Sequence, residues 1–128
     1  MRIANINIIL LIGAVLGLAS MMLAAYVDHG AALYLSSQLL SKVMTAVRYQ
    51  QMYAVVIVML GLVLPLQSNM RVKKWLQRSA MIFILGVLLF CCGIYGGLMM
   101  GVGQLIYLTP LGGIVLMLGW LCLLSVAL

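Results

Sequence analysis

The sequence predicts an all-α polytopic membrane protein, a bundle of four transmembrane helices, from its apolar content, its scarcity of charge and its long apolar runs. Hydrophobic residues make up 67% of the 128 residues and charged residues 6%, whereas about a quarter of the residues in a soluble domain are charged. Four long apolar runs without strand periodicity follow one another along the chain. Because backbone polar groups facing lipid must bond within their own segment, these runs are predicted to be helices of one transmembrane domain, 1–128.

The first two predicted helices cover residues 3–27 and 45–66. Ile3 to Val27 carries no charged residue and exceeds the roughly 20 residues that a spanning helix needs. The run is also longer than the apolar core of a signal peptide, which reaches about 15 residues. The second helix is predicted to end near Pro65, because proline lacks the N–H that a helix interior requires.

The third and fourth predicted helices cover residues 79–102 and 109–128. The third follows a basic cluster at residues 71–78, which we assign to the middle loop. Thr109 can cap the fourth helix, and Pro110 suits its first position because the missing N–H would have no partner there. At about 1.5 Å per residue, this last helix is just long enough to cross the hydrocarbon.

An apolar stripe also runs between the first two helices, in residues 31–47. Leu35, Leu39 and Val43 recur at spacings of four, and serine, glutamine and lysine residues lie between them. This amphipathic pattern predicts a short interfacial helix on the outer surface of the membrane. An ordinary hydrated loop is the alternative.

Basic residues predict the orientation of the bundle in a bacterial inner membrane. Four helices place both termini and the middle loop on one side. Five of the seven basic residues would lie on that side, and two on the other: Arg2, Arg71, Lys73, Lys74 and Arg78 against Lys42 and Arg48. The positive-inside rule therefore places the termini in the cytoplasm. The net charge of +6 comes from basic residues that we interpret as topology determinants facing anionic lipid. We predict no nucleic-acid partner.

Small residues recur at helical spacing on two of the predicted helices. Gly93, Gly97 and Gly101 are four residues apart, and Gly13 and Gly17 begin a similar face on the first helix. Small residues let helices approach closely in lipid, where tight packing supplies the attraction. These glycines are therefore candidates for helix packing within one bundle, or for contact with a second copy or another membrane protein.

Asp28 and His29 are the only acidic side chain and the only histidine of the chain. We expect them to end the first helix at the outer interface, with Asp28 neutralised by a basic side chain, Lys42 or Arg48, and His29 bonded to backbone or tyrosine hydroxyl groups across the bundle. A candidate polar cluster gathers at this side of the membrane: Asp28, His29, Arg48, Tyr49 and Tyr53. Anchoring at the interface is the expected role of Arg48 and the tyrosines, and a ligand site is the alternative.

The sequence predicts no enzyme, no metal site and no cofactor. A single carboxylate cannot form the acid–base pair that many hydrolases use. Cys91, Cys92 and Cys122 lie in apolar runs without the spacing of a zinc site. No two of the eleven methionines stand three or four residues apart, so no helical turn presents paired thioethers for a soft metal ion.

Three segments resemble a known family. They are Thr45–Ala54, Leu89–Tyr95 and Leu108–Gly113, the last with the sequence Leu-Thr-Pro-Leu-Gly-Gly. They are similar to the small four-helix membrane proteins of domain-of-unknown-function family 423, which are the YgdD-like and transmembrane protein 256-like proteins. The resemblance covers nearly the whole chain and implies a multi-pass membrane protein. It implies no activity.

The chain departs from the family pattern at three places. A small residue is usual in the family where Asp28 stands, a second histidine where Tyr53 stands, and Ser-Gly-Ser where residues 91–93 stand.

The sequence leaves two candidate functions. The first is a structural or accessory membrane protein that acts by helix packing with itself or a partner. The alternative is a small dimeric transporter or channel for a small solute or ion.

Overall fold

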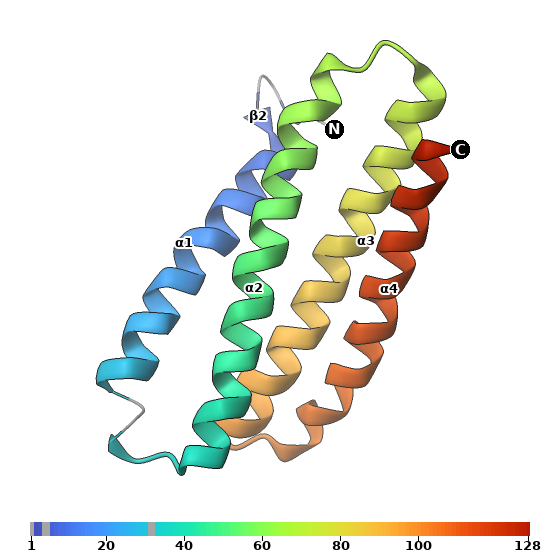
Figure 1. Ribbon diagram of the computed structural model, residues 1–128. Coiled ribbons are helices and arrows are strands. Elements are labelled where there is room, and N and C mark those ends of the chain that lie inside the picture. Colours follow the sequence, from blue (N-terminus) through green and yellow to red (C-terminus); the bar gives the residue numbers. More distant parts are fainter. Residues whose placement is uncertain (1, 4–5, 31–32) are drawn as a thin grey trace.

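Four long helices make up nearly all of the protein. The computed structural model describes residues 2–3, 6–30 and 33–128 (Figure 1). Each helix is long and apolar enough to cross a membrane, which confirms the predicted all-α membrane fold. The helices are α1 (Ile8–His29), α2 (Ser37–Val63), α3 (Met70–Ile94) and α4 (Leu108–Ala127). A two-residue antiparallel pair, β1 (Arg2–Ile3) with β2 (Ile6–Asn7), precedes α1.

Shorter helical turns extend or precede three of the long helices. The 3₁₀ turn Leu64–Leu66 continues α2, and the π-helical turn Tyr95–Met99 continues α3. A second 3₁₀ turn, Gly103–Tyr107, leads into α4. Gly101 has a φ of 75° in the connection between the last two turns, a conformation that glycine adopts without strain.

The helices follow one another in a row, with α2 and α3 in the middle (Figure 1). The closest pairs are α3 with α4 and α1 with α2. In the most apolar stretches of the helices, 39% of α2 and 44% of α3 is buried, against only 17% of α1 and α4. The two outer helices therefore turn most of their surface toward the membrane. Leu128 and the start of α1 lie at the same end of the molecule as the α2–α3 connection (Figure 1).

Two helices begin at capping residues that the sequence analysis assigned to other structures. Ser36 caps α2, because its Oγ accepts a hydrogen bond from the backbone N–H of Leu39 at 3.3 Å. Residues 37–47 are therefore the first turns of α2, and the prediction of a separate interfacial helix was wrong from Ser37 onward. Residues 31–32 of that predicted helix lie outside the described residues.

Asn69 caps α3 in the same way. Its Oδ1 accepts hydrogen bonds from the backbone N–H groups of Arg71 at 2.9 Å and Val72 at 3.4 Å. The basic cluster therefore forms the first two turns of α3, and the helix starts at Met70 instead of the predicted residue 79. The expected start of α1 at residue 3 also moves, because Asn7 caps this helix through the N–H of Leu10 at 3.2 Å.

The prediction that Thr109 caps the last helix was wrong. Thr109 is the second residue of α4, and its Oγ1 donates a hydrogen bond to the carbonyl oxygen of Phe90 on α3 at 3.4 Å. Pro110 still lies in the first turn of α4, where the missing N–H needs no helical partner.

Glycines bring the backbones of paired helices into contact. A methyl group built on Gly13 of α1 would lie 2.8 Å from the backbone nitrogen of Val58, and one on Gly61 of α2 would lie 2.7 Å from that of Leu10. Both distances are too short for a real side chain, so α1 and α2 meet at these glycines. Gly17 is less tightly enclosed, since the nearest atom would be the Ala54 Cβ at 3.7 Å.

The contact between α3 and α4 uses glycines of both helices. A methyl group on Gly112 would lie 2.7 Å from the Cα of Phe90, and one on Gly119 would lie 2.7 Å from the ring of Phe83. Gly93 faces Thr109 in the same close manner. A methyl group on Gly97 would lie 3.1 Å from the Cβ of Ile106, in the 3₁₀ turn that precedes α4.

Gly101 does not take part in this packing. No heavy atom lies within 4 Å of a methyl group built on it. The regular spacing that suggested one glycine face on residues 93–101 ends where the helix ends, so Gly101 serves the turn instead of a helix contact.

Candidate functional site

Gln50 is the centre of a buried polar network. Its side chain is only 3% exposed, and its Nε2 donates a hydrogen bond to the carbonyl oxygen of Leu16 on α1 at 2.9 Å. Its Oε1 accepts a hydrogen bond from the hydroxyl group of Tyr95, at the end of α3, at 2.8 Å. One amide on α2 therefore joins α1, α2 and the π-helical turn that extends α3.

A second hydrogen bond between helices lies one turn further along the same face of α2. The indole Nε1 of Trp120 on α4 donates a hydrogen bond to the hydroxyl group of Tyr53 at 2.9 Å. The Phe83 ring lies against both partners, with ring centroids 5.4 Å from Tyr53 and 5.1 Å from Trp120. Phe83 is fully buried and Tyr53 is 5% exposed, so this aromatic cluster fills the centre of the bundle.

Other buried polar side chains also bond to backbone carbonyl groups. The Ser79 hydroxyl donates to the carbonyl oxygen of Gly119 at 3.0 Å, and Ser20 donates to that of Gly17 at 2.6 Å. Within the described residues, no buried side-chain nitrogen or oxygen atom lacks a hydrogen-bond partner. The polar groups inside the bundle are thus engaged with one another, as buried polar groups must be to avoid a desolvation cost.

The structure places the five residues of the candidate polar cluster in different environments. Asp28 and His29 are exposed at the last turn of α1, and Arg48 is exposed on α2. Tyr49 is 40% exposed and stacks on Phe90, with ring centroids 4.7 Å apart. The position of Tyr53 in the core is incompatible with the interfacial anchoring expected for it.

The hydrogen bond expected between His29 and a tyrosine hydroxyl group is not among those of the described residues. The hydroxyl group of Tyr26, which is also in the last turns of α1, pairs with that of Tyr34. The hydroxyl groups of Tyr53 and Tyr95 bond to Trp120 and Gln50 deeper in the bundle.

Sequence reasoning missed the partners in the buried network. Tyr95 and Trp120 are distant from α2 in the sequence, and only the fold brings them to Gln50 and Tyr53. One signal was available: Gln50 and Tyr53 are three residues apart, hence on one face of an otherwise apolar helix.

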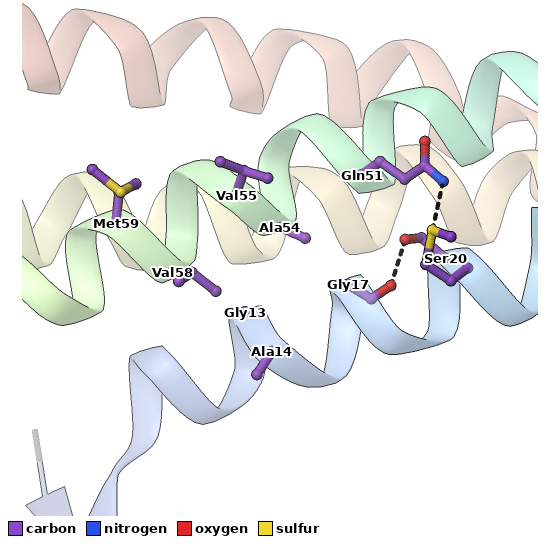
Figure 2. Close-up of a pocket in the computed structure, with 10 residues that line it drawn as sticks. Gly13, Ala14, Gly17, Ser20, Gln51, Ala54, Val55, Val58 and Met59 are labelled. Atoms are coloured by element: carbon purple, nitrogen blue, oxygen red, sulfur yellow. Dashed lines mark hydrogen bonds between the residues drawn. The ribbon is translucent and has the colours of Figure 1, made fainter.

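An open groove of about 410 Å³ lies between α1 and α2 (Figure 2). Gly13, Ala14 and Gly17 form its α1 wall, and Ala54, Val55, Val58 and Met59 form much of its α2 wall. Gln51 enters the groove from α2 and donates one hydrogen bond, to the sulfur atom of Met21 at 3.6 Å. Because a thioether is a weak acceptor, the amide of Gln51 is poorly satisfied.

The described residues contain no group of three or more histidine, cysteine, aspartate or glutamate side chains that could hold a metal ion. Cys91 is buried and donates its thiol to the carbonyl oxygen of Ala46 at 3.4 Å. This cysteine therefore helps to join α3 to α2.

Comparisons with known proteins agree with this architecture. Residues 23–113 match a family described as "Protein of unknown function (DUF423)". The chain is also similar to a protein of Haemophilus influenzae named "UPF0382 membrane protein", with 26% identity over 110 residues, which cover 86% of this chain and 85% of that protein. No solved structure matches the chain significantly. Four membrane-length helices and the family match over most of the chain lead to one conclusion: the protein is an integral, multi-pass membrane protein and belongs to the DUF423 family.

Proposed function

We propose that this protein works by helix packing, as a structural or accessory membrane protein that pairs with a second copy of itself, and not as an enzyme. The buried hydrogen-bond network carries this proposal. A transporter or channel needs polar groups that face a cavity. Gln50, Tyr53 and Ser79 instead bond to neighbouring helices, which supports a structural role for them.

The groove between α1 and α2 is the proposed contact surface. Its walls include glycine and alanine residues, whose small size allows a helix of a second copy to come close. Gln51 adds hydrogen-bonding capacity, because an amide both donates and accepts and can therefore pair with its own copy across a two-fold axis. Such bonds between helices stabilise association in lipid by roughly 0.6–2 kcal/mol each.

Ala14→Phe is expected to weaken self-association strongly, because the ring would fill the groove. Ala14 is exposed and lines the groove, so the substitution leaves the α1–α2 contact at Gly13 in place. Leu18→Phe is the matched control, since Leu18 is 65% exposed on α1 outside the groove. Energy transfer between labelled copies in liposomes, measured over a range of protein-to-lipid ratios, gives the dimer fraction of each.

We expect wild type and Leu18→Phe to associate equally, and Ala14→Phe to associate at least tenfold more weakly. A wild-type protein that stays monomeric at every ratio would contradict pairing with itself. Unchanged association of Ala14→Phe would exclude the groove as the contact surface.

The same proposal includes a bacterial inner-membrane location with both termini in the cytoplasm. Arg71, Lys73, Lys74 and Arg78 lie in the first turns of α3, at the end of the bundle where α4 also finishes (Figure 1). This concentration of basic residues supports a cytoplasmic position for that end.

Reporter domains fused after Leu128 or inserted at residues 67–69 are expected to give a cytoplasmic signal. The insertion belongs at 67–69 because α3 starts at Met70. A reporter inserted at residues 100–103, in the connection before α4, should give the opposite signal. A periplasmic signal at Leu128 or at 67–69 would reverse the proposed topology.

A further inference from the structure

A second groove, of about 530 Å³, lies between α3 and α4 near the end of the bundle where α3 begins. Its volume is within the range of small-ligand sites, about 300–1,000 Å³. Lys74, Gln77 and Arg78 line one part of the groove, and Met81, Ile82 and Cys122 line the rest. The groove is therefore basic at one end and apolar at the other.

Along α3 the basic residues come before the apolar ones, in the same order as the headgroup and the acyl chains of a lipid molecule. Lys74 and Arg78 are four residues apart and share a face of the helix, and Ile82 continues that face. At 1.5 Å per residue, Ile82 lies about 12 Å deeper than Lys74 along the helix axis. This separation matches the step from the headgroup layer of a bilayer into its hydrocarbon.

The charges in this groove have no acidic side chain near them. The chain contains one acidic side chain, Asp28, and it lies in the last turn of α1, at the other end of the bundle (Figure 1). Arg78 is held at the rim by Trp75, with its guanidinium carbon 5.1 Å from the centroid of the indole ring. Two neighbouring cations without an acidic side chain near them attract an anion from the membrane.

We infer that this groove binds an anionic phospholipid. The phosphate group lies between Lys74 and Arg78, and one acyl chain follows Met81, Ile82 and Cys122 along the contact between α3 and α4. Charge complementarity selects anionic over zwitterionic lipid, and the apolar floor selects a lipid over a free phosphate ion.

Native mass spectrometry of the full-length protein in mild detergent tests this site. The protein is titrated with phosphatidylglycerol or with phosphatidylcholine of the same acyl chains. The first phosphatidylglycerol is expected to bind about tenfold more tightly than phosphatidylcholine, given the usual attraction of an anionic lipid by each nearby basic side chain. Lys74→Gln with Arg78→Gln should remove most of this preference.

Lys42→Gln with Arg48→Gln is the matched control. It removes the same net charge from exposed positions on α2, outside this groove, and should leave the preference intact. Met81→Trp fills the apolar part of the groove and is expected to weaken binding of both lipids at the first site.

Three results would overturn the inference. Equal affinity for the two lipids would remove the role of charge. Equal loss in both double variants would indicate a diffuse attraction by the net charge, without a site. Displacement of phosphatidylglycerol by millimolar inorganic phosphate would mean that the acyl chain contributes nothing, and that the groove holds only the anion.

Discussion

Gly112→Ala is expected to destabilise the protein strongly, while Gly113→Ala, at the next position, leaves its stability unchanged or slightly higher. A methyl group on Gly112 would meet the backbone of Phe90, including its Cα at 2.7 Å, and backbone cannot move aside as a side chain can. Overpacking of this kind costs about 1–3 kcal/mol or more. A methyl group on Gly113 meets no atom within 4 Å, and alanine favours a helix over glycine by up to about 1 kcal/mol.

The pair can be compared by thermal unfolding of the purified proteins in one detergent. Both variants have the same composition, so a difference between them reports the environment of the two positions. If Gly112→Ala unfolds at the wild-type temperature, the close approach of α3 and α4 at Phe90 is not a feature of the folded protein.

Gln50→Leu is expected to lower the stability of the folded monomer by about 1–3 kcal/mol, the usual cost of leaving a buried partner unpaired. The substitution introduces an apolar side chain of similar size and removes the hydrogen bonds to the Leu16 carbonyl group and the Tyr95 hydroxyl group. Gln51→Leu is the neighbouring control, since the side chain of Gln51 makes a single hydrogen bond, to the sulfur of Met21. It should leave monomer stability nearly unchanged and weaken the proposed dimer.

A double-mutant cycle with Tyr95→Phe isolates the shared hydrogen bond. Once the Tyr95 hydroxyl group is absent, Gln50→Leu should cost less than it does in the wild-type protein. Strictly additive effects in reversible unfolding experiments would mean that Gln50 and Tyr95 do not interact, and that the network does not join α3 to α2.

The number and type of the helices could be predicted from the sequence, because length and hydropathy alone decide whether a segment crosses a membrane. Their starts could not. The basic stretch after Asn69 resembles a loop, although the cap hydrogen bonds start α3 there. The stretch after Ser36 has a helical pattern, but this pattern does not show that it continues without a break into the rest of α2. Thr109 had a suitable position for a cap, but a contact with α3 takes its hydroxyl group.

The candidate site was harder to predict than the fold. A polar residue near the end of an apolar run can lie at the interface or in the core, and the sequence gives no sign of which face meets another helix. Tyr49 and Tyr53 illustrate this, since they are one turn apart and yet one is 40% exposed and the other 5%. The glycine pattern had the same weakness, because spacing alone does not distinguish Gly97, near Ile106, from Gly101, which has no neighbour.

Because Gln50 and Tyr53 both lie on α2, their hydrogen bonds form in a defined order during synthesis and membrane insertion. When helices enter the membrane in chain order, the Nε2 of Gln50 can bond to α1 as soon as α2 is present. Its Oε1 has no hydrogen bond from Tyr95 until α3 has been synthesised. The hydroxyl group of Tyr53 accepts its hydrogen bond from Trp120 only after α4 has been synthesised. Each new helix satisfies one more polar group of α2, so a nascent chain that stops early presents an unpaired hydrogen-bonding group within the bilayer. The completed bundle satisfies these groups of Gln50 and Tyr53.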